Sequence, residues 1–381
     1  MRVLHFYKTY FPDTYGGVEQ VIYQIAQGAV SQGVGTRILT LTRSSGIGPC
    51  RVGNHVVERL PLDLEIASNA FSLRSIGRLR DMAADADVIH YHFPWPFMDL
   101  AHFLARIDKP SVVTYHSDIV RQKFLNRIYS PLRNRFLSNV TRIVATSPNY
   151  LDTSDVLRVH REKTVVIPIG LDDSSYPDID ADCVDRWRKT VGSNFFLFVG
   201  ALRYYKGLHF LLDAIDGTNL KVVIVGGGPM ERALKEQAGR LKGAQVDFLG
   251  MLPDSDKVAL LHLAKGVVFP SYLRSEAFGV SLLEGAMYAK PLISTDIGTG
   301  TSYINVNGET GIIVPPENPS ALRQAMEYIL EHPDVAREMG WRGRQRYESL
   351  FTAERMVGSY IKLYGEIVGN CGSPDGDTPT T

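Results

Sequence analysis

The sequence predicts an α/β protein built from two doubly wound domains that face each other across a cleft. The chain has 381 residues and 44% of them are hydrophobic, which is enough for two separate cores. Short β-rich runs alternate with helical patterns along both halves of the chain. The run V-I-P-I-G-L-D at 166–172 and the Pro- and Asp-rich segment 174–182 mark the expected junction.

Each half supplies its own set of expected strands. In the first half they are residues 2–6, 36–42, 88–91, 111–115 and 142–146. In the second half they are residues 195–199, 221–225, 245–249, 266–270, 291–294 and 311–314. Continuous apolar runs are typical of parallel sheets that helices cover on both faces. Ligands of such sheets bind beyond the carboxyl ends of the strands, so we expect the site in the cleft.

These patterns set the expected domain boundaries. The first domain is expected to span 1–172 and the second 173–352. The last helix, 353–368, is expected to cross back to the first domain. The tail 369–381 is short and rich in Gly, Pro and Thr, so we expect it to be disordered.

Composition excludes several classes of protein. No apolar run approaches the length of a membrane span, and the first ten residues lack the apolar stretch of a signal peptide. We therefore expect a cytosolic protein. Cys50, Cys183 and Cys371 are far apart and show no paired spacing, which predicts a reducing compartment, no disulfide and no zinc site.

The net charge is zero, but the charges are unevenly divided. Residues 1–170 hold 20 Lys or Arg and 14 Asp or Glu, whereas residues 171–381 hold 21 and 27. This division predicts an anionic partner for the first half. Nucleic acid is disfavoured because no Lys/Arg run is interleaved with aromatic residues. An anionic membrane surface is favoured.

A basic amphipathic segment between residues 119 and 140 supports a membrane partner. Apolar side chains recur there every fourth position, at Val120, Phe124, Ile128, Leu132, Phe136 and Val140. The basic residues between them are Arg121, Lys123, Arg127, Arg133 and Arg135. Pro131 is expected to kink the helix or to start a second one. Such a helix can lie among lipid headgroups; the alternative is an ordinary helix packed on a sheet, with a solvated basic face.

The most informative segment is S-E-A-F-G-V-S-L-L-E at 275–284. On one helix Glu276 and Glu284 would be turned roughly 80° apart and about 12 Å along the axis. They are too far apart to share a proton or a metal, so we expect them to contact different parts of one elongated ligand. Gly279 lets the backbone approach that ligand, and the amides of a helix N-terminus attract a phosphate or a sugar hydroxyl. The alternative is a helix with two solvated glutamates.

Three loops after expected strands add further candidates. Gly16 and Gly17 precede a helix, so their amides can approach a phosphate. V-G-A-L-R-Y-Y-K-G at 199–207 places Arg203 and Lys206 where two cations clamp a diphosphate. The run G-G-G-P at 226–229 is not the dinucleotide fingerprint, and no ribose-binding acid follows at the required distance, so NAD is disfavoured.

Histidines and one acidic pair complete the candidates. His116 closes a strand at the cleft end, where it meets substrate or, alternatively, is only a hydrogen-bonded terminal histidine. His90 and His92 share one face of a strand and bind a metal if a third ligand approaches; the alternative is a pair of buried histidines. The run D-A-D at 85–87 is interpreted as a strand-entry turn rather than a metal motif.

The order and spacing of these motifs resemble the retaining GT-B glycosyltransferases of family 4 over nearly the whole chain. The similarity is greatest to bacterial mannosyl- and D-rhamnosyltransferases that build O-antigen (A-band-like) chains of lipopolysaccharide. It rests on M-R-V-L-H-F-Y-K-T-Y-F-P, Y-H-F-P-W-P-F-M-D-L and V-A-T-S-P-N-Y. The resemblance implies an N-terminal acceptor-side domain and a C-terminal domain that binds the nucleotide sugar.

The resemblance also implies roles for single residues. Glu284 would hold the ribose, and Glu276 would bind hydroxyls of the donor sugar together with the amides of Ala277, Phe278 and Gly279. In the same way Arg203 and Lys206 would neutralise the leaving phosphate, Gly16 and Gly17 would approach it, and His116 would contact the sugar near its anomeric centre. Many relatives carry Arg where this chain has Ala201, so the role of Lys206 is more secure than that of Arg203.

The implied activity is transfer of D-mannose or D-rhamnose from GDP-mannose or GDP-D-rhamnose to a lipid-linked oligosaccharide, with the α-configuration retained. The resemblance implies no cofactor and no metal. It implies a peripheral location on the inner face of the cytoplasmic membrane, with other polysaccharide-assembly glycosyltransferases as partners. Two alternatives stay open: another GT-B enzyme such as a sugar-nucleotide epimerase, and a non-catalytic sugar-nucleotide-binding protein.

Overall fold

A computed structural model describes residues 1–14, 16–44, 46–66, 69–119 and 123–371. The chain forms two compact units. Unit 1 comprises residues 1–146, 154–170 and 353–381, and unit 2 comprises residues 147–153 and 171–352. The sequence places the boundary after residue 172 and misses the short segment that joins unit 2. That segment belongs to unit 2 because the Asn149 side chain donates to Ser302 Oγ at 3.1 Å and Thr153 Oγ1 accepts from Arg274 at 2.9 Å.

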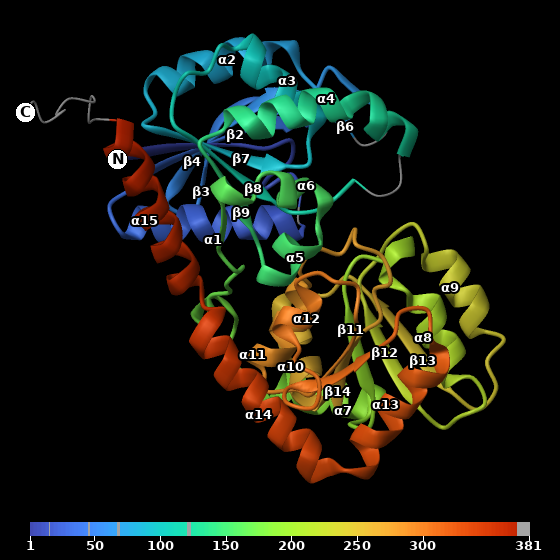
Figure 1. The fold of residues 1–381 in the computed structure, drawn as a ribbon. Helices are drawn as coiled ribbons and strands as arrows, with labels where there is room; N and C mark the ends of the chain where they lie inside the picture. Colours follow the sequence, from blue (N-terminus) through green and yellow to red (C-terminus); the bar gives the residue numbers. More distant parts are fainter. Residues whose placement is uncertain (15, 45, 67–68, 120–122, 372–381) are drawn as a thin grey trace, which may run out of the picture. The chain divides into compact units, whose positions relative to one another are not determined.

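Unit 1 contains one large sheet in the order β10-β9-β8-β7-β1-β2-β4-β3 (Figure 1). Its strands are β1 (Arg2–Phe6), β2 (Gly35–Thr42), β3 (Gly48–Val52), β4 (His55–Pro61), β7 (Val88–Phe93), β8 (Ser111–Tyr115), β9 (Arg142–Ala145) and β10 (Thr164–Val166). All neighbours are parallel except β3 and β4. A separate hairpin pairs β5 (Leu64–Ile66) with β6 (Asn69–Phe71).

The helices of unit 1 cover both faces of this sheet. They are α1 (Gly17–Ser31), α2 (Leu73–Ala84), α3 (Pro96–Leu104), α4 (Lys123–Asn139), α6 (Asp155–Val159) and α15 (Ala353–Cys371). Helices α1 and α15 lie side by side on one face, and a methyl group added at Gly28 would come within 2.5 Å of Val357 Cγ2. Helix α15 therefore packs against unit 1, and residues 369–371, expected in a tail, are helical. Residues 372–381 lie outside the described residues.

Unit 2 contains a parallel sheet in the order β13-β12-β11-β14-β15-β16. Its strands are β11 (Phe196–Val199), β12 (Lys221–Val225), β13 (Gln245–Gly250), β14 (Gly266–Phe269), β15 (Leu292–Thr295) and β16 (Gly311–Val314). Its helices are α5 (Pro148–Thr153), α7 (Ala181–Val191), α8 (Leu208–Ile215), α9 (Glu231–Ala238), α10 (Asp254–Leu263), α11 (Val280–Met287), α12 (Thr301–Ile304), α13 (Pro319–Glu331) and α14 (Pro333–Leu350).

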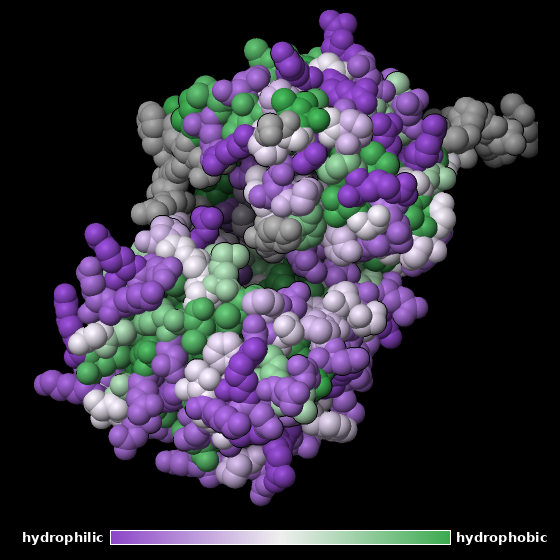
Figure 2. All heavy atoms as spheres, turned by 180° about the vertical axis from the view of Figure 1, so that it is seen from behind, coloured by the Kyte–Doolittle hydropathy of each residue, from purple (hydrophilic) through white to green (hydrophobic). Residues whose placement is uncertain are grey.

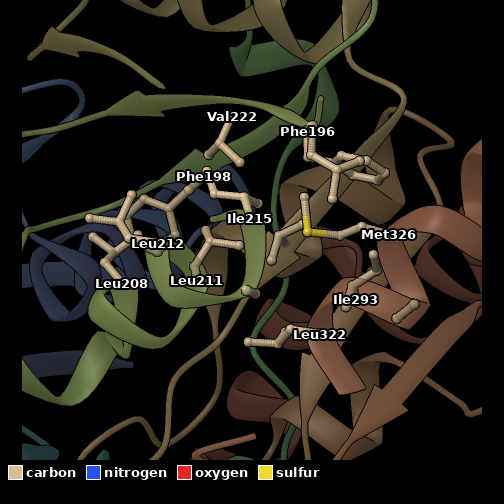
Figure 3. Packing of buried hydrophobic residues seen from close by; sticks show 14 of the residues in the cluster. Phe196, Phe198, Leu208, Leu211, Leu212, Ile215, Val222, Ile293, Leu322 and Met326 are labelled. Atoms are coloured by element: carbon tan, nitrogen blue, oxygen red, sulfur yellow. The ribbon is translucent and has the colours of Figure 1, made fainter. Parts of the chain in front are cut away.

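The apolar runs of the unit 2 strands explain its core. Phe196, Phe198 and Val222 point from β11 and β12 onto Leu211 of α8, and Met326 of α13 closes the same cluster (Figure 3). All five side chains are 1% exposed or less, so each contributes close to its full transfer free energy, about 1.5–3 kcal/mol. This packing fixes the sheet that carries the candidate site.

The predicted fold class is confirmed, since every run expected to form a strand is a strand within two residues of its expected ends. The sequence missed β3, β4, β5, β6 and β10. Strands β3 and β4 form an antiparallel edge hairpin around Gly53, which has φ +54°. Arg51 in β3 and the adjacent Glu58 and Arg59 in β4 interrupt the apolar character by which the central strands were identified.

The basic segment is partly within the described residues, which leave out 120–122. Helix α4 runs through Pro131, so of the two expected alternatives the start of a second helix is excluded, and the kink stays a prediction. The far end of the helix is anchored in the core, because Phe136 and Leu137 are buried. In contrast, Ile128 is 65% exposed. The 85–87 turn is confirmed: it lies between α2 and β7, and Asp87 accepts a hydrogen bond from the Arg2 amide at 2.7 Å.

Candidate functional site

The candidate site of unit 2 lies where the strand order reverses. Strands β11 and β14 are neighbours, and the chain continues from them toward opposite edges of the sheet. Loops that follow such a pair diverge and leave a crevice at the carboxyl ends of the strands, where ligands of doubly wound sheets bind. The loop after β11 carries Arg203 and Lys206, and the loop after β14 carries Glu276.

Backbone contacts hold these two loops together. The Tyr272 amide donates to the Tyr205 carbonyl at 3.0 Å. Gly207 has φ +68°, and a side chain there would place its Cβ 2.0 Å from the Pro270 carbonyl oxygen. Only glycine permits both this left-handed conformation and the close approach. The loops therefore meet at a fixed separation.

This separation brings Lys206 and Glu276 together. Lys206 Nζ forms an ion pair with Glu276 Oε2, and each residue is 9% exposed. Ser271 Oγ donates to the same carboxylate oxygen at 3.2 Å, and Nζ lies 4.5 Å from the centre of the Phe269 ring. Removing one partner of a buried pair leaves the other charge uncompensated, which is strongly destabilising. The pair is therefore a preorganised cation and carboxylate at the carboxyl ends of β11 and β14.

A helix N-terminus follows Glu276 directly. Helix α11 begins at Val280, and its N-cap residue Gly279 has φ +99°, as the sequence predicts for a close backbone approach. Among the described residues, the amides of Ala277, Phe278 and Gly279 donate no hydrogen bond. The Ala277 carbonyl accepts from the Gly300 amide at 2.8 Å, which fixes this turn. Three amides at a helix N-terminus suit hydroxyl or phosphate oxygens.

Glu284 lies one turn inside α11 and is 5% exposed. Its Oε1 accepts from Tyr176 Oη and from Lys257 Nζ, both at 2.8 Å. Lys257 Nζ also contacts Asp254 Oδ1 at 2.8 Å. Burial alone lowers the pKa of Lys257, but the charge of Glu284 and the hydrogen bonds that Lys257 donates to Asp254 and Glu284 raise it above its ordinary value. Lys257 is therefore a cation that holds the Glu284 carboxylate in place.

Tyr176 and Lys257 are the residues of this site that the sequence reasoning missed. Burial, followed by the charge of Glu284, raises the pKa of the Tyr176 phenol, which keeps it a hydrogen-bond donor. Tyr176 lies in the polar junction and Lys257 in α10, and neither belongs to a motif. The only signal in the sequence is a lone Lys between acidic residues in D-S-D-K at 254–257.

Arg203 is placed differently from Lys206. It is the N-cap residue of a short 3-10 helix (Tyr204–Lys206), and it is exposed. Within the described ranges it takes part in no ion pair. Ala201 is exposed beside it. Both positions lie on the loop after β11, but only Lys206 is built into the contact with Glu276.

Gly16, Gly17 and His116 lie in unit 1. Gly16 caps α1 with extended backbone, and Gly17 is the first residue of that helix instead of preceding it. A Cβ at Gly16 would come within 2.6 Å of Glu19 Oε2, a buried carboxylate held by Thr14 at 3.0 Å. His116 follows β8, and its amide donates to the Phe93 carbonyl at 3.0 Å.

Two family models match this chain, one in each half. Residues 15–175 match the family model described as Glycosyltransferase Family 4, and residues 184–346 match Glycosyl transferases group 1. A protein named D-rhamnosyltransferase WbpZ, from Pseudomonas aeruginosa, is 58% identical over 93% of this chain and 93% of its own length. One named O-antigen chain mannosyltransferase C, from Escherichia coli, is 50% identical over 96% of this chain and 98% of its own.

Solved structures show the fold alone. Sucrose-phosphate synthase from Thermosynechococcus elongatus superposes with a TM-score of 0.78 at 19% identity, covering 97% of this chain and 99% of that one. The Anabaena protein HepE, in complex with UDP-glucose, gives a TM-score of 0.75 at 18% identity, covering 96% and 100%. These neighbours share the GT-B fold, which confirms the two Rossmann-like domains.

Proposed function

Because this chain belongs to the family 4 glycosyltransferases, we propose that it transfers D-mannose or D-rhamnose from the GDP-sugar to a lipid-linked oligosaccharide in O-antigen synthesis. The donor sugar keeps its α-configuration in this proposal. The identities of 58% and 50% to a D-rhamnosyl- and a mannosyltransferase support the two donor sugars.

The observation that carries the proposal is the arrangement at the strand reversal of unit 2. Lys206 supplies a cation, and Glu276 with the following amides supplies acceptors and donors for sugar hydroxyls. One helical turn on, Glu284 supplies a carboxylate suited to the two hydroxyls of a ribose. A nucleoside diphosphate sugar needs a cation for its diphosphate, hydrogen-bonding groups for its sugar and a carboxylate for its ribose, all within one site.

The reaction follows from charge. Breaking the bond between C1 and the diphosphate creates an oxocarbenium-like sugar and a diphosphate anion, so a cation placed at the anion is the main contribution of the protein. In the proposal Lys206 keeps its pair with Glu276 and donates another N–H to the phosphate. Arg203 assists, and Gly16 and Gly17 approach the phosphate with their amides. His116 contacts the sugar near C1.

We assign no nucleophilic carboxylate to this reaction. The acceptor hydroxyl attacks on the face that the diphosphate leaves, and the departing phosphate oxygen takes its proton. A sugar trapped covalently on an Asp or Glu during turnover would contradict this route. Protein mass spectrometry of quenched reactions provides the measurement.

The acceptor side of the proposal involves a membrane surface. No helix in the described part of the chain has the length and apolar content to span a bilayer. Unit 1 exposes the large apolar side chains Ile47, Leu64, Ile66, Leu73, Leu100, Leu104 and Ile128. Arg127 and Arg135 are exposed on α4, as is Ile128. On the face drawn in Figure 2, hydrophobic residues are scattered among hydrophilic ones. Apolar and basic side chains together suit an anionic headgroup layer.

A substrate screen tests the proposed function. GDP-mannose, GDP-D-rhamnose, UDP-glucose and UDP-galactose are each incubated with a synthetic lipid-diphosphate acceptor, and products are read by mass spectrometry. We expect product from one or both GDP-sugars. Conversion of the sugar nucleotide to an epimer without acceptor would favour the epimerase. GDP binding without product from any acceptor would favour the non-catalytic protein.

A further inference from the structure

Four buried histidines meet in unit 1, and three of them form a continuous hydrogen-bonded row. His5 lies on β1, His92 on β7, and His116 directly after β8. His5 Nδ1 lies 3.0 Å from His92 Nε2, and His92 Nδ1 lies 3.0 Å from His116 Nε2. The His5 and His92 rings are stacked, as are those of His92 and His116, with centroids 5.3 Å apart in both cases. His5 and His92 are 0% exposed and His116 is 6% exposed.

The fourth, His90, is bonded elsewhere. Its Nδ1 lies 2.7 Å from Tyr364 Oη of α15, and its Nε2 lies 2.7 Å from Thr114 Oγ1. Both of its ring nitrogens are therefore already satisfied. Its ring packs on that of His92 at 4.3 Å between centroids, so it restricts the plane of His92 without joining the row.

The histidines of the row are neutral. Burial lowers the pKa of His116 to about 3, and burial together with His55 lowers the pKa of His5 to about 3. Burial and the neighbouring histidines also lower the pKa of His92. A neutral imidazole has one N–H and one bare nitrogen. Because His92 uses both nitrogens in the row, it donates in one bond and accepts in the other.

Two proton arrangements satisfy both bonds, and they differ in what they leave at the ends. In the first arrangement His116 Nε2–H donates to His92 Nδ1, and His92 Nε2–H donates to His5 Nδ1. The remaining proton of His5 is then on Nε2, which has no partner among the described residues. In the second arrangement His5 Nδ1–H donates to His92 Nε2, and His92 Nδ1–H donates to His116 Nε2. His5 Nε2 is then a bare nitrogen, and His116 carries its proton on Nδ1. A buried N–H without an acceptor costs more than an unused lone pair. The second arrangement is therefore the stable one.

We propose that His92, supported by His5, is a positioning residue that fixes His116 as an Nδ1–H hydrogen-bond donor to an oxygen of the donor sugar. This inference rests on the proposed function for the identity of the acceptor atom. A neutral donor of fixed tautomer binds a hydroxyl or ring oxygen near C1 without adding positive charge beside the developing oxocarbenium. A His116 free to exchange tautomers would present a bare nitrogen part of the time.

A metal is the competing explanation for this cluster. His5, His90 and His92 offer ligand atoms within 4.8 Å of one another. However, a tetrahedral zinc ion bonded at about 2.0–2.1 Å holds two nitrogens roughly 3.3 Å apart. The 3.0 Å between His5 Nδ1 and His92 Nε2 is a hydrogen-bond distance instead. His90 would also have to give up one of its two bonds to serve as the third ligand.

The direct test is nitrogen NMR of the full chain labelled with ¹⁵N at histidine, at neutral pH. The signals of His92 and His116 are assigned by their loss in His92→Asn and His116→Asn. We expect protonated Nδ1 and bare Nε2 in both residues, before and after addition of GDP-mannose. Protonated Nε2 in His116 would overturn the proposal. One equivalent of zinc in the purified protein, lost in His5→Leu, would overturn it as well.

Variants of His92 supply the functional readout. His92→Leu removes the bond to His116, whereas the amide nitrogen of His92→Asn replaces Nδ1 as its donor. We expect His92→Leu to lower kcat about three- to tenfold, the usual effect of one hydrogen bond, with His116 in mixed tautomers. His92→Asn is expected to stay within twofold of the wild type.

The matched control is His102→Leu. His102 is a buried imidazole of the same unit, bonded to Tyr91 Oη at 2.9 Å and to Asn139 Oδ1 at 2.6 Å, and it lies outside the row. A fall in kcat in His102→Leu equal to that in His92→Leu would mean that only packing is lost, and would overturn the proposal. Absence of transfer by the wild type would count against the proposed function, while the NMR spectrum would still decide the tautomer.

Discussion

Lys206 and Glu276 form a buried ion pair in unit 2, on two loops that a backbone hydrogen bond of 3.0 Å between Tyr272 and Tyr205 holds together. Gly207 permits this approach because any side chain there would overlap the Pro270 carbonyl. The pair places a cation at the strand reversal before any ligand is bound. Preorganised charge of this kind needs no rearrangement as the leaving group develops its own charge.

Lys206→Ala is expected to lower kcat by about 10²-fold or more, the scale for losing one anion-stabilising group. The measurement is GDP release in the presence of acceptor. Lys235→Ala is the control, because Lys235 pairs with Glu231 at 2.7 Å on the surface of the same unit. Near-normal turnover by Lys206→Ala would remove Lys206 from the leaving-group contact.

Glu284→Gln is expected to weaken GDP binding about 10- to 100-fold, since a hydrogen bond to a charged group contributes about 1.5–3 kcal/mol. Isothermal titration calorimetry with GDP measures it. Glu338→Gln, which removes an exposed partner of Arg342, serves as the control. If Glu284→Gln bound GDP as the wild type does, the ribose would have to be held elsewhere.

Replacing Arg121, Lys123 and Arg127 together with Gln is expected to weaken binding to anionic vesicles about 100-fold, at about 1 kcal/mol for each charge near the surface. Donor hydrolysis without acceptor should not change. The control replaces three exposed cations of unit 2, Arg232, Arg240 and Lys242, in the same way. Equal loss in both triple variants, or no loss in either, would mean that these three cations form an ordinary solvated face.

The histidine row predicts a loss of stability in acid. The pKa of His5 falls to about 3 in the fold because of burial and then His55, whereas an unfolded histidine titrates near 6.5. Below about pH 6.5 the unfolded chain therefore binds a proton that the folded chain does not. Stability is fully present above that pH and is lost as the pH falls toward 3, by up to about 1.4 kcal/mol per pH unit for each such group.

His5→Leu is expected to reduce the slope of the unfolding free energy against pH between pH 6.5 and pH 5. The reduction corresponds to at most one bound proton. Urea unfolding at several pH values gives the slope. Val112→Ala in β8, which is separated from β1 by β7, also removes buried side-chain volume and should lower stability without changing the slope. An unchanged slope in His5→Leu would mean that His5 is protonated in the folded protein.

Much of the fold is predictable from the sequence because the central strands are rich in apolar and β-branched residues and alternate with helices. Strands β3 and β4 were missed because polar residues interrupt their apolar character, Arg51 in β3 and Glu58 and Arg59 in β4. The helix start at Gly279 was also predictable, because a glycine before an apolar helical pattern indicates a close approach. These features depend on residues that are near one another in the chain.

The candidate site was less predictable because its contacts join distant segments. The resemblance marks Lys206 and Glu276 as ligand contacts, but their ion pair arises from the packing of β11 beside β14. Tyr176 and Lys257 reach Glu284 from a junction and a helix without motifs. His5 is a single histidine in β1, and only the parallel register that sets it opposite His90 brings it to the other histidines.

The most direct test of the account is a crystal structure of the protein with GDP-mannose or GDP bound. We expect the diphosphate within hydrogen-bond distance of Lys206 Nζ, the ribose hydroxyls on Glu284, and phosphate or sugar oxygens at the amides of Ala277, Phe278 and Gly279. A nucleotide bound away from Lys206 and Glu284 would contradict it.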